Sequence, residues 1–389
     1  MDIHTAARLD HFQTGIFAAL DKKKEEFQKT GRKMYNLFIG TPDFPVAPHV
    51  RDALLEAAKD PENWHYSLRD TPEMLEAVKE YYKKRFNVEI STDEIMSVSG
   101  SQEGVAHLGL ALCDPGDIVL LPNPGYPVFE VGAYLGGADL YFYDLKEEND
   151  FLPRFDLIPE EIAVKAKYIM VSYPYNPVCA IAPVRFYEEL LEFSRKYNII
   201  IVHDNAYSDI IYDGEYGGSF LNFPGAKDQG VEFFSLSKSF NVTGARISFV
   251  IGNRTVIDAM KLLRTQYDFG MFYPVQQAAI AALKGPLDGV REQCLKYQKR
   301  RDALCGGLRR IGWNVADSKG TMFVWARIPE GFGSSNDFCM KLLEATGVLC
   351  TPGSAFGSCG EGYVRFALVL PVEEINEMIQ VIDDSGILR

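Results

Sequence analysis

The sequence predicts an α/β protein in which helices cover a mostly parallel sheet and a smaller lobe follows. Between about residues 90 and 252, short apolar runs alternate with segments such as 184–196, whose apolar residues recur at helical spacing. That alternation is typical of a parallel sheet with helices on both faces. Gly285-Pro286 then ends the mostly helical pattern of 254–283. We therefore expect a large domain over 49–285 and a small α/β domain over 286–389, which the N-terminal arm, 1–48, partly joins.

The composition is that of a folded, acidic protein. A chain of 389 residues, 47% of them hydrophobic, is long enough to bury a large core in two lobes. The net charge of −13 opposes a nucleic-acid partner, because such a partner requires a basic surface. No run approaches 18 apolar residues and the N-terminus has no charged-then-apolar signal, so we expect a cytoplasmic protein without membrane insertion.

The cysteines and histidines give no sign of a metal centre. The seven cysteines lack the paired spacing of a zinc site and are expected to be reduced thiols. The six histidines form no cluster of ligands in the sequence, so we expect no metal ion. His203 precedes Asp204 in a strand-like run and is expected on the opposite face, as a hydrogen-bonded core residue.

A lysine and an arginine lie eight residues apart in Ser235-Leu-Ser-Lys238-Ser-Phe-Asn-Val-Thr-Gly-Ala-Arg246. The apolar runs 231–234 and 247–251 flank this stretch and are typical of buried strands, which places Lys238 on the loop between them. A carbonyl cofactor that carries a phosphate needs an amine for an imine bond and a fixed cation for the phosphate. From these twelve residues alone, two ordinary surface cations remain the alternative.

Two further apolar runs lead into side chains that suit a pyridine ring. The run 199–203 ends at Asp204, and Tyr207 follows three residues later. A buried carboxylate is costly unless it meets a cation, and the protonated ring nitrogen of a pyridine cofactor is such a cation. The run that begins at 168 leads into Asn176-Pro177, which supplies an amide donor. A helix-capping aspartate, a packing tyrosine and an ordinary turn are the competing explanations.

The segment 100–104 forms a glycine-containing turn that suits an anion. It follows the strand-like run 94–99 and opens the amphipathic segment 105–112, so free N–H groups and the positive end of a helix dipole would face a phosphate. Its spacing is neither that of a Walker loop nor that of the dinucleotide fingerprint, and a plain strand-turn-helix explains it equally well. Tyr126, on a turn after 118–121, can lie against a flat ring or cap the core.

Taken in order, these residues resemble the pyridoxal-phosphate site of class I/II aminotransferases, which have fold type I. The matching positions are Gly40, Tyr66, Ser99-Gly100-Ser101, Tyr126, Asn176-Pro177, Asp204 with Tyr207, Ser235 with Lys238 and Arg246, and Arg365. The match extends over nearly the whole chain, and its specificity lies in the order and spacing of the elements. The resemblance implies a large domain with a mostly parallel sheet sandwiched by helices and a smaller α/β C-terminal domain.

The resemblance also implies a role for each position. Lys238 would hold pyridoxal 5'-phosphate through an imine and then act as the base that moves the substrate α-proton, while Asp204 would keep the pyridine nitrogen protonated. Arg365 would clamp the substrate α-carboxylate, because guanidinium offers a two-pronged geometry that ammonium lacks. The other implied cofactor-binding residues are Tyr207 and Asn176 at the ring hydroxyl, Tyr126 on the ring, and Gly100, Ser101, Gln102, Ser235, Arg246 and Tyr66 at the phosphate. Gly40 and Asn176 would join Arg365 in the substrate site.

Arg365 has a simpler competing explanation. Val364, Phe366 and Leu368 alternate with it, so Arg365 points to the opposite face of a strand. An exposed arginine on an edge strand would give the same pattern.

Four places depart from the family pattern. Val178-Cys179 stands where Thr-Gly is usual, Asp70 and Leu75 stand where Gly and Arg are usual, and Ser248 stands where Gly is usual. None of these changes removes a residue that would touch the cofactor. The chemistry is therefore expected to persist, while the backbone path after Pro177 and the choice of substrate are open.

The segments 123–133, 145–153 and 275–283 are similar to the LL-diaminopimelate aminotransferase branch of the family. They are scaffold segments that do not bind the distal end of a substrate, so they leave the substrate pair undecided. The pair is LL-diaminopimelate with 2-oxoglutarate or a related pair of alanine, aspartate or an aromatic amino acid with a 2-oxo acid. The implied activity is ping-pong transfer of an amino group between an amino acid and a 2-oxo acid. The implied assembly is a homodimer with composite active sites, in which Tyr66 reaches the partner's phosphate site.

Two other classes of protein compete with this interpretation. A pyridoxal-phosphate-dependent C–S lyase would share the Lys238 site, but the segment 38–45 lacks the tryptophan-containing motif expected of that group. A regulator built on an aminotransferase-like lobe would need an appended DNA-binding domain. The chain begins directly at the N-terminal arm and is acidic, which opposes that function.

Overall fold

The computed structural model describes residues 1, 3–12, 15–215 and 217–389. This part of the chain forms two compact units. The terminal unit comprises Met1–Gly40, Lys299–Asp317 and Phe323–Arg389, and the central unit comprises Thr41–Gln298 and Ser318–Met322. The domain limits expected from the sequence, 1–48, 49–285 and 286–389, stay a prediction.

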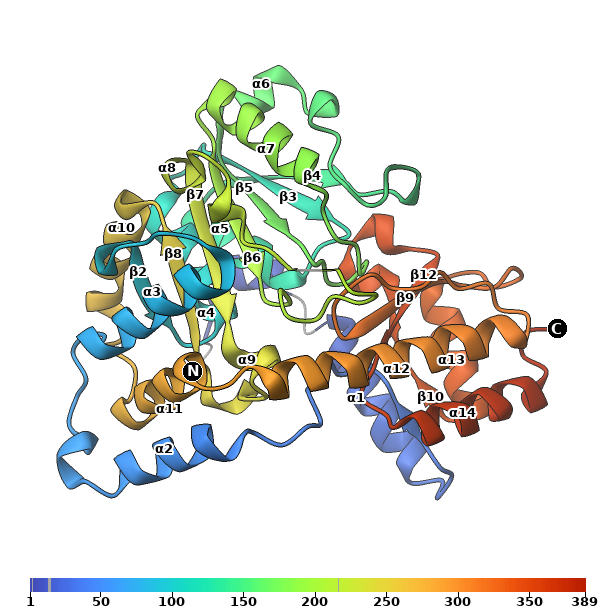
Figure 1. The fold of residues 1–389 in the computed structure, drawn as a ribbon. Coiled ribbons are helices and arrows are strands. Elements are labelled where there is room, and N and C mark those ends of the chain that lie inside the picture. The colour runs from blue at the N-terminus through green and yellow to red at the C-terminus, as the bar shows by residue number, and fades with distance from the viewer. Residues whose placement is uncertain (2, 13–14, 216) are drawn as a thin grey trace. The chain divides into compact units, whose positions relative to one another are not determined.

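The central unit is built on a seven-stranded sheet (Figure 1). In spatial order its strands are β2 (Ile95–Val98), β8 (Ser248–Gly252), β7 (Gly230–Ser235), β6 (Ile200–Asn205), β5 (Ala166–Ser172), β3 (Ile118–Asn123) and β4 (Asp139–Asp144). Neighbours pair in parallel except at β8, which is antiparallel to both β2 and β7. Strands β3, β7 and β8 are buried at every residue, as expected where helices cover both faces of a sheet. The predicted mostly parallel α/β sheet is confirmed.

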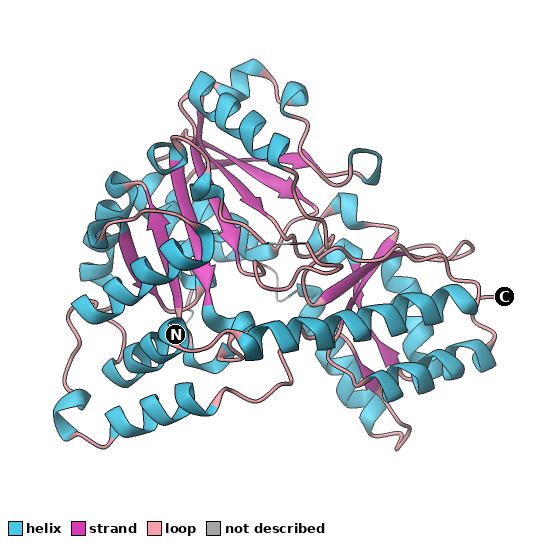
Figure 2. Ribbon diagram, viewed as in Figure 1, coloured by secondary structure: helices cyan, strands magenta, loops and turns pink. Residues whose placement is uncertain are grey.

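Helices surround this sheet, and Figure 2 shows the strands as an inner layer among them. The helices of the central unit are α2 (Pro48–Ala58), α3 (Pro72–Phe86), α4 (Ser101–Leu112), α5 (Val131–Gly136), α6 (Glu160–Ala163), α7 (Val184–Tyr197), α8 (Ala226–Gln229), α9 (Leu236–Ser239), α10 (Arg254–Tyr267) and α11 (Tyr273–Lys284). Helix α4 packs on β7 and β8 and against α5 and α10. The apolar face predicted for 184–196 is the buried face of α7, which ends at Tyr197 and is followed by Asn198 in the left-handed conformation, with φ +57°.

The strand directions bring seven chain segments to one edge of the sheet. The carboxyl ends of β2, β3, β4, β5, β6 and β7 meet there, and β8, which runs the other way, begins there. Ser172 is paired with Asp204 across β5 and β6, and Ser235 is paired with Ser248 across β7 and β8. Ligands bind at this edge in open α/β sheets.

The terminal unit has its own small sheets and core. Its strands are β1 (Tyr35–Asn36), β9 (Phe323–Arg327), β10 (Val348–Leu349), β11 (Thr351–Pro352) and β12 (Tyr363–Ala367), and its helices include α1 (Gly15–Gln28), α13 (Ser335–Thr346) and α14 (Val372–Ser385). Strand β12 lies between β11 and β9 and is antiparallel to both. Its five residues are all buried.

The helix α12 (Asp288–Arg310) carries the chain from the central into the terminal unit. It is 23 residues long and rich in charged side chains. Among the described residues, no helix combines the length and apolarity needed to cross a membrane.

Candidate active site

Lys238 lies on a single helical turn rather than on the loop that the sequence predicted. The turn, α9, begins directly after β7, because the Ser235 hydroxyl accepts the Ser237 N–H at 3.2 Å and caps it. The side-chain amide of Gln293 donates to the Lys238 carbonyl at 2.8 Å. The loop prediction was wrong because a helix of four residues is too short for an apolar period to reveal it. The backbone that carries the amine is thus held at both ends of the turn.

Gly100, Ser101 and Arg246 form a positively charged cradle. Gly100 has φ +88°, and a Cβ built on it would lie 2.1 Å from Nη2 of Arg246, so a side chain at this position would displace the guanidinium. Helix α4 begins at Ser101, which brings its first N–H groups and the positive end of its dipole to the same place. Gln102, the next residue of α4, is exposed. The cradle offers both the charge and the donors that bind an anion at a helix N-terminus.

Three serine hydroxyls form a chain of hydrogen bonds from this cradle to the end of β7. The hydroxyl of Ser101 donates to Ser248 at 3.2 Å, and that of Ser248 donates to Ser235 at 3.0 Å. Ser101 and Ser235 were predicted site residues. Sequence reasoning missed Ser248, although a serine at a position where the family pattern has glycine was the available signal.

Asp204 presents a buried carboxylate oxygen near the end of β6. Its Oδ1 atom has no hydrogen-bond partner among the described residues. Burial raises the pKa of the Asp204 carboxyl from 3.8 to about 7; His203 opposes the shift and Glu232 adds to it. A buried acceptor in this state is unsatisfied. The position therefore suits a cationic N–H donor.

His203 and Glu232 form the buried pair beside Asp204. Nδ1 of His203 lies 3.0 Å from Oε2 of Glu232, and both side chains are fully buried. Glu232 also accepts from the Tyr82 hydroxyl at 2.9 Å and from the Ser219 hydroxyl at 2.7 Å. His203 is thus the hydrogen-bonded core residue that the strand alternation predicted.

Asn176, Tyr207 and Tyr126 follow the ends of three neighbouring strands. Asn176 comes after β5 and Tyr207 after β6, and both are buried. Tyr126 comes after β3 and is half-buried, with its ring edge-on to Phe129 at 5.9 Å between centroids. Because the strand order is β6, β5, β3, the three segments lie in a row along the same edge of the sheet.

The backbone after Asn176 adopts a conformation typical of glycine. Cys179 has φ +61° although it carries a side chain. Its N–H donates to the Tyr175 carbonyl at 2.6 Å, and its thiol lies 3.4 Å from the Thr321 hydroxyl. The cysteine thus occupies a left-handed position where the family pattern has glycine.

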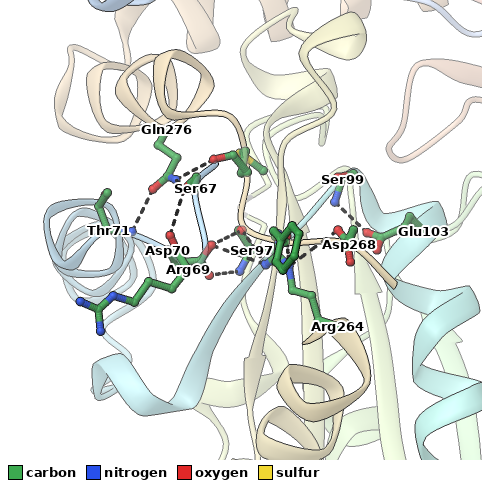
Figure 3. Close-up of polar contacts among 12 residues, drawn as sticks. Ser67, Arg69, Asp70, Thr71, Ser97, Ser99, Glu103, Arg264, Asp268 and Gln276 are labelled. Carbon is green, nitrogen blue, oxygen red and sulfur yellow. Dashed lines mark hydrogen bonds and ion pairs between the residues drawn. The ribbon is translucent and has the colours of Figure 1, made fainter. Parts of the chain in front are cut away.

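Tyr66 lies on an exposed loop, and hydrogen bonds of Ser67 and Thr71 to Gln276 hold the base of this loop (Figure 3). Its side chain is 83% exposed and packs against Phe269, with 5.4 Å between ring centroids. Gln276 donates to the Ser67 hydroxyl at 2.8 Å and accepts the Thr71 N–H at 2.9 Å. The loop therefore presents an aromatic side chain to the outside of the central unit from a fixed base.

Arg365 and Gly40 belong to the terminal unit and share one neighbour there. Arg365 is 4% exposed in the middle strand β12, so it is not an exposed arginine on an edge. Its guanidinium carbon lies 4.1 Å from the centroid of the Phe323 ring and 4.7 Å from that of Phe356. A Cβ on Gly40 would lie 2.3 Å from the Phe323 ring, so a side chain at this position would displace the ring that lies against Arg365. A buried, forked cation between two rings suits a carboxylate ligand.

Tertiary structure also gathers Glu103, His107 and Asp268, whose potential ligand atoms lie within 4.8 Å of one another. No sequence spacing indicated this group. Glu103 accepts the Ser99 N–H at 2.7 Å and pairs with Nδ1 of His107 at 2.7 Å. The contact that the group makes with the predicted site is this bond to Ser99, which fixes the turn just before Gly100 (Figure 3).

Comparison with known proteins identifies the family. The family model for aminotransferase class I and II matches residues 32–382. An LL-diaminopimelate aminotransferase of Halothermothrix orenii is 42% identical over 387 residues, which cover 99% of each chain. Substrate-bound BacF from Bacillus subtilis has a TM-score of 0.94 at 35% identity, covering 99% of this chain and 98% of that chain. A probable N-succinyldiaminopimelate aminotransferase from Thermus thermophilus has a TM-score of 0.90 at 34% identity, covering 95% of this chain and 99% of that chain.

These similarities confirm fold type I and the resemblance read from the residues. They support transamination between amino acids and 2-oxo acids and give no support to the C–S lyase alternative. Enzymes of this family use pyridoxal 5'-phosphate as their cofactor. The chain belongs to the class I and II aminotransferases and is a pyridoxal-phosphate-dependent transaminase.

Proposed function

We propose that the protein transfers an amino group from LL-diaminopimelate to 2-oxoglutarate. The observation that carries this proposal is the set of LL-diaminopimelate aminotransferases that align along nearly the whole chain. Those of Halothermothrix orenii, Moorella thermoacetica and Aquifex aeolicus are 42%, 41% and 41% identical over 93% or more of it. An alanine aminotransferase from Pyrococcus furiosus has the same fold at 27% identity. Alanine, aspartate and aromatic donors are therefore the competitors in the test.

The residues of the central unit fit pyridoxal 5'-phosphate. The cradle of Gly100, Ser101 and Arg246 supplies a cation and helix N–H groups for the phosphate. The unsatisfied Oδ1 of Asp204 supplies a buried acceptor for a protonated ring nitrogen. When bound, the cofactor supplies an electron sink that lets a proton leave the α-carbon of the amino acid.

We assign the proton transfer to Lys238. Its amine would hold the cofactor at its carbonyl carbon in the resting enzyme and, as a free amine, would move the proton of the substrate α-carbon. The fixed turn α9 limits the positions that the amine can reach. Asp204, as a carboxylate, would hold the positive charge on the ring nitrogen, and Asn176 and Tyr207 would donate to the ring hydroxyl. Tyr126 would lie against the ring.

The remaining assignments concern the phosphate and the substrate carboxylate. The phosphate would be held by Gly100, Ser101, Gln102, Ser235 and Arg246. Arg365 would bind the substrate α-carboxylate through both prongs of its guanidinium, with Gly40 and Asn176 beside the substrate.

A homodimer in the cytoplasm completes the proposal. Trp64, Tyr66 and Leu68 are 65%, 83% and 70% exposed on one short segment that runs from the end of a 3-10 turn into the following loop. Exposed apolar side chains that cluster in this way mark association surfaces. We infer that this loop binds a second copy of the chain and that Tyr66 reaches the partner's phosphate site.

A screen of half-reactions tests the substrate. The holoenzyme is mixed in single turnover with LL-, meso- and DD-diaminopimelate, lysine, alanine, aspartate, tyrosine and glutamate, and the cofactor absorbance is followed. We expect LL-diaminopimelate and glutamate to react fastest and the other two diaminopimelate stereoisomers to react at least about tenfold more slowly. Lys238→Ala is the control and should react with none. A faster reaction with alanine, aspartate or tyrosine would replace the proposed donor.

A further inference from the structure

The first residue of β8 lies between the two strands that lead to Ser101 and Ser235, two of the proposed phosphate-binding residues. Ser248 is paired with Ser235 on β7 and with Val98 on β2. Val98 leads directly into Ser99-Gly100 and then Ser101. Because β8 is antiparallel to both neighbours, its beginning meets their ends, and one side chain there can reach both hydroxyls.

The Ser248 hydroxyl makes both contacts. It accepts from Ser101 at 3.2 Å and donates to Ser235 at 3.0 Å, and the residue is fully buried. Two residues before it, Arg246 supplies the cation of the cradle. The segment 246–248 therefore contributes both the positive charge of the cradle and the hydroxyl that connects Ser101 with Ser235.

The hydrogen-bond capacity of Ser235 shows what this connection does. Its oxygen accepts from the Ser248 hydroxyl and from the Ser237 N–H at 3.2 Å. A hydroxyl oxygen has two lone pairs, so both are in use and only its proton remains available. Ser235 is 5% exposed, so bulk water is a poor partner for that proton. A ligand oxygen is then the acceptor that satisfies it.

We propose that Ser248 is a positioning residue for the cofactor phosphate. By donating to Ser235 and accepting from Ser101, it turns the Ser235 proton toward the phosphate and polarises the whole hydroxyl chain in that direction. The inference rests on the proposed phosphate roles of Ser101, Ser235 and Arg246. It also gives a function to the serine at a position where the family pattern has glycine, since glycine cannot link the two hydroxyls.

Comparing two forms of the cofactor tests this role. Cofactor-free wild type, Ser248→Ala and Ser248→Gly are titrated with pyridoxal 5'-phosphate and with pyridoxal, which lacks the phosphate. In both variants the Kd for the phosphorylated form should rise about fivefold to tenfold, since one hydrogen bond to a charged group is weakened. The Kd for pyridoxal should stay within about twofold. The ³¹P resonance of the bound cofactor should shift in both variants, and this readout does not depend on turnover.

The control is Ser194→Ala, which removes another buried hydroxyl that donates within the central unit, to the Ile199 carbonyl at 2.6 Å. It should lower thermal stability without changing the ratio of the two affinities. The inference is overturned if the Ser248 variants lose equal affinity for pyridoxal and for pyridoxal 5'-phosphate, or if they lose no affinity for either. If one Ser248 variant fails to fold, the other decides. If wild type itself binds pyridoxal 5'-phosphate no more tightly than pyridoxal, the proposed phosphate site fails as well. The wild-type titration thus distinguishes failure of the phosphate site from failure of the Ser248 role alone.

Discussion

Asp70 accepts two hydrogen bonds from Ser97, from its N–H at 2.8 Å through Oδ2 and from its hydroxyl at 2.5 Å through Oδ1 (Figure 3). Arg264 completes the arrangement, because its Nη1 donates to the Ser97 carbonyl at 2.8 Å and lies 3.5 Å from Oδ1 of Asp70. Ser97 lies on β2, the edge strand of the sheet. The two side chains thus bind the polar groups that an edge strand leaves open. An aspartate at a position where the family pattern has glycine ties the Tyr66 loop to the sheet.

Asp70→Gly should therefore lower the free energy of unfolding by about 3 kcal/mol. The side chains of Asp70 and Arg264 are 7% and 11% exposed, so the change removes a nearly buried ion pair and the acceptor of both Ser97 hydrogen bonds, while Asp268, 3.7 Å from Nε of Arg264, remains. Urea denaturation measures the effect. Asp156→Asn is the matched control, because its ion pair with Arg154 is more than half exposed and should contribute within about 0.5 kcal/mol. A loss no larger than that of the control would contradict the role of Asp70.

Borohydride reduction of the holoenzyme should fix the cofactor on Lys238. The expectation follows from its place on the capped turn between β7 and Arg246. Peptide mapping by mass spectrometry locates the adduct, which should persist in Lys227→Ala, whose lysine pairs with Glu94, and vanish in Lys238→Ala. An adduct on any other lysine rejects the assignment.

Asp204 should make the stability of the cofactor-free protein depend on pH. Its folded pKa of about 7 lies above the usual 3.8, so the folded state favours the protonated form. The stability that this carboxyl contributes is present below about pH 4, falls as the pH rises toward 7, and is lost above it. Asp204→Asn should remove this fall and make the cofactor-free variant more stable than wild type at pH 8, by roughly 2–4 kcal/mol. Thermal unfolding between pH 5 and 8 measures the difference.

The same substitution should have the opposite effect on catalysis. With cofactor bound, an asparagine cannot hold the charge on the ring nitrogen, so Asp204→Asn should slow turnover at least about 100-fold while cofactor remains bound. Near-normal turnover would count against this role, and a cofactor-free variant that still loses stability with rising pH would count against the buried carboxyl as its cause.

Arg365→Lys should weaken amino-acid and 2-oxo-acid substrates together, by about 2–3 kcal/mol. The lysine keeps the charge but loses the fork that matches a carboxylate. Cofactor affinity should not change, because the proposed phosphate cation is Arg246. Single-turnover titrations with parallel measurement of cofactor occupancy give both quantities. The control is Arg327→Lys. Arg327 lies on the neighbouring strand β9 and stacks on Tyr363 of β12, so this change should leave substrate affinity as in wild type.

Tyr66 and Lys238 should complement each other between subunits. A Tyr66→Ala protein and a Lys238→Ala protein, each of low activity, should regain part of the wild-type activity when mixed, because hybrid dimers contain one site with both residues intact. The recovery should rise with time of subunit exchange. A fully active monomer in sedimentation, or no recovery despite hybrid formation by mass spectrometry, would end the composite-site proposal.

The sequence alone determined the features that repeat locally along the chain. The apolar runs 199–203 and 231–234 marked buried strands, because burial on both faces of a sheet selects continuous apolar residues. The end of each run then showed where polar residues such as Asp204 emerge. Alternation along a strand also placed His203 on the opposite side from Asp204, where it meets Glu232. These inferences need no knowledge of which strands are neighbours.

Only the tertiary structure decided the contacts that join distant segments. Ser101 and Ser248 are 147 residues apart, and Ser97 and Arg264 are 167 apart. Whether such pairs touch depends on strand order and register, and no periodicity encodes either. The same is true of the four-residue turn under Lys238, which depends on a serine cap and on Gln293 rather than on an apolar pattern. Hydrophobic burial is a property of each residue, whereas a hydrogen bond needs two groups within about 3 Å, and the fold alone sets that distance.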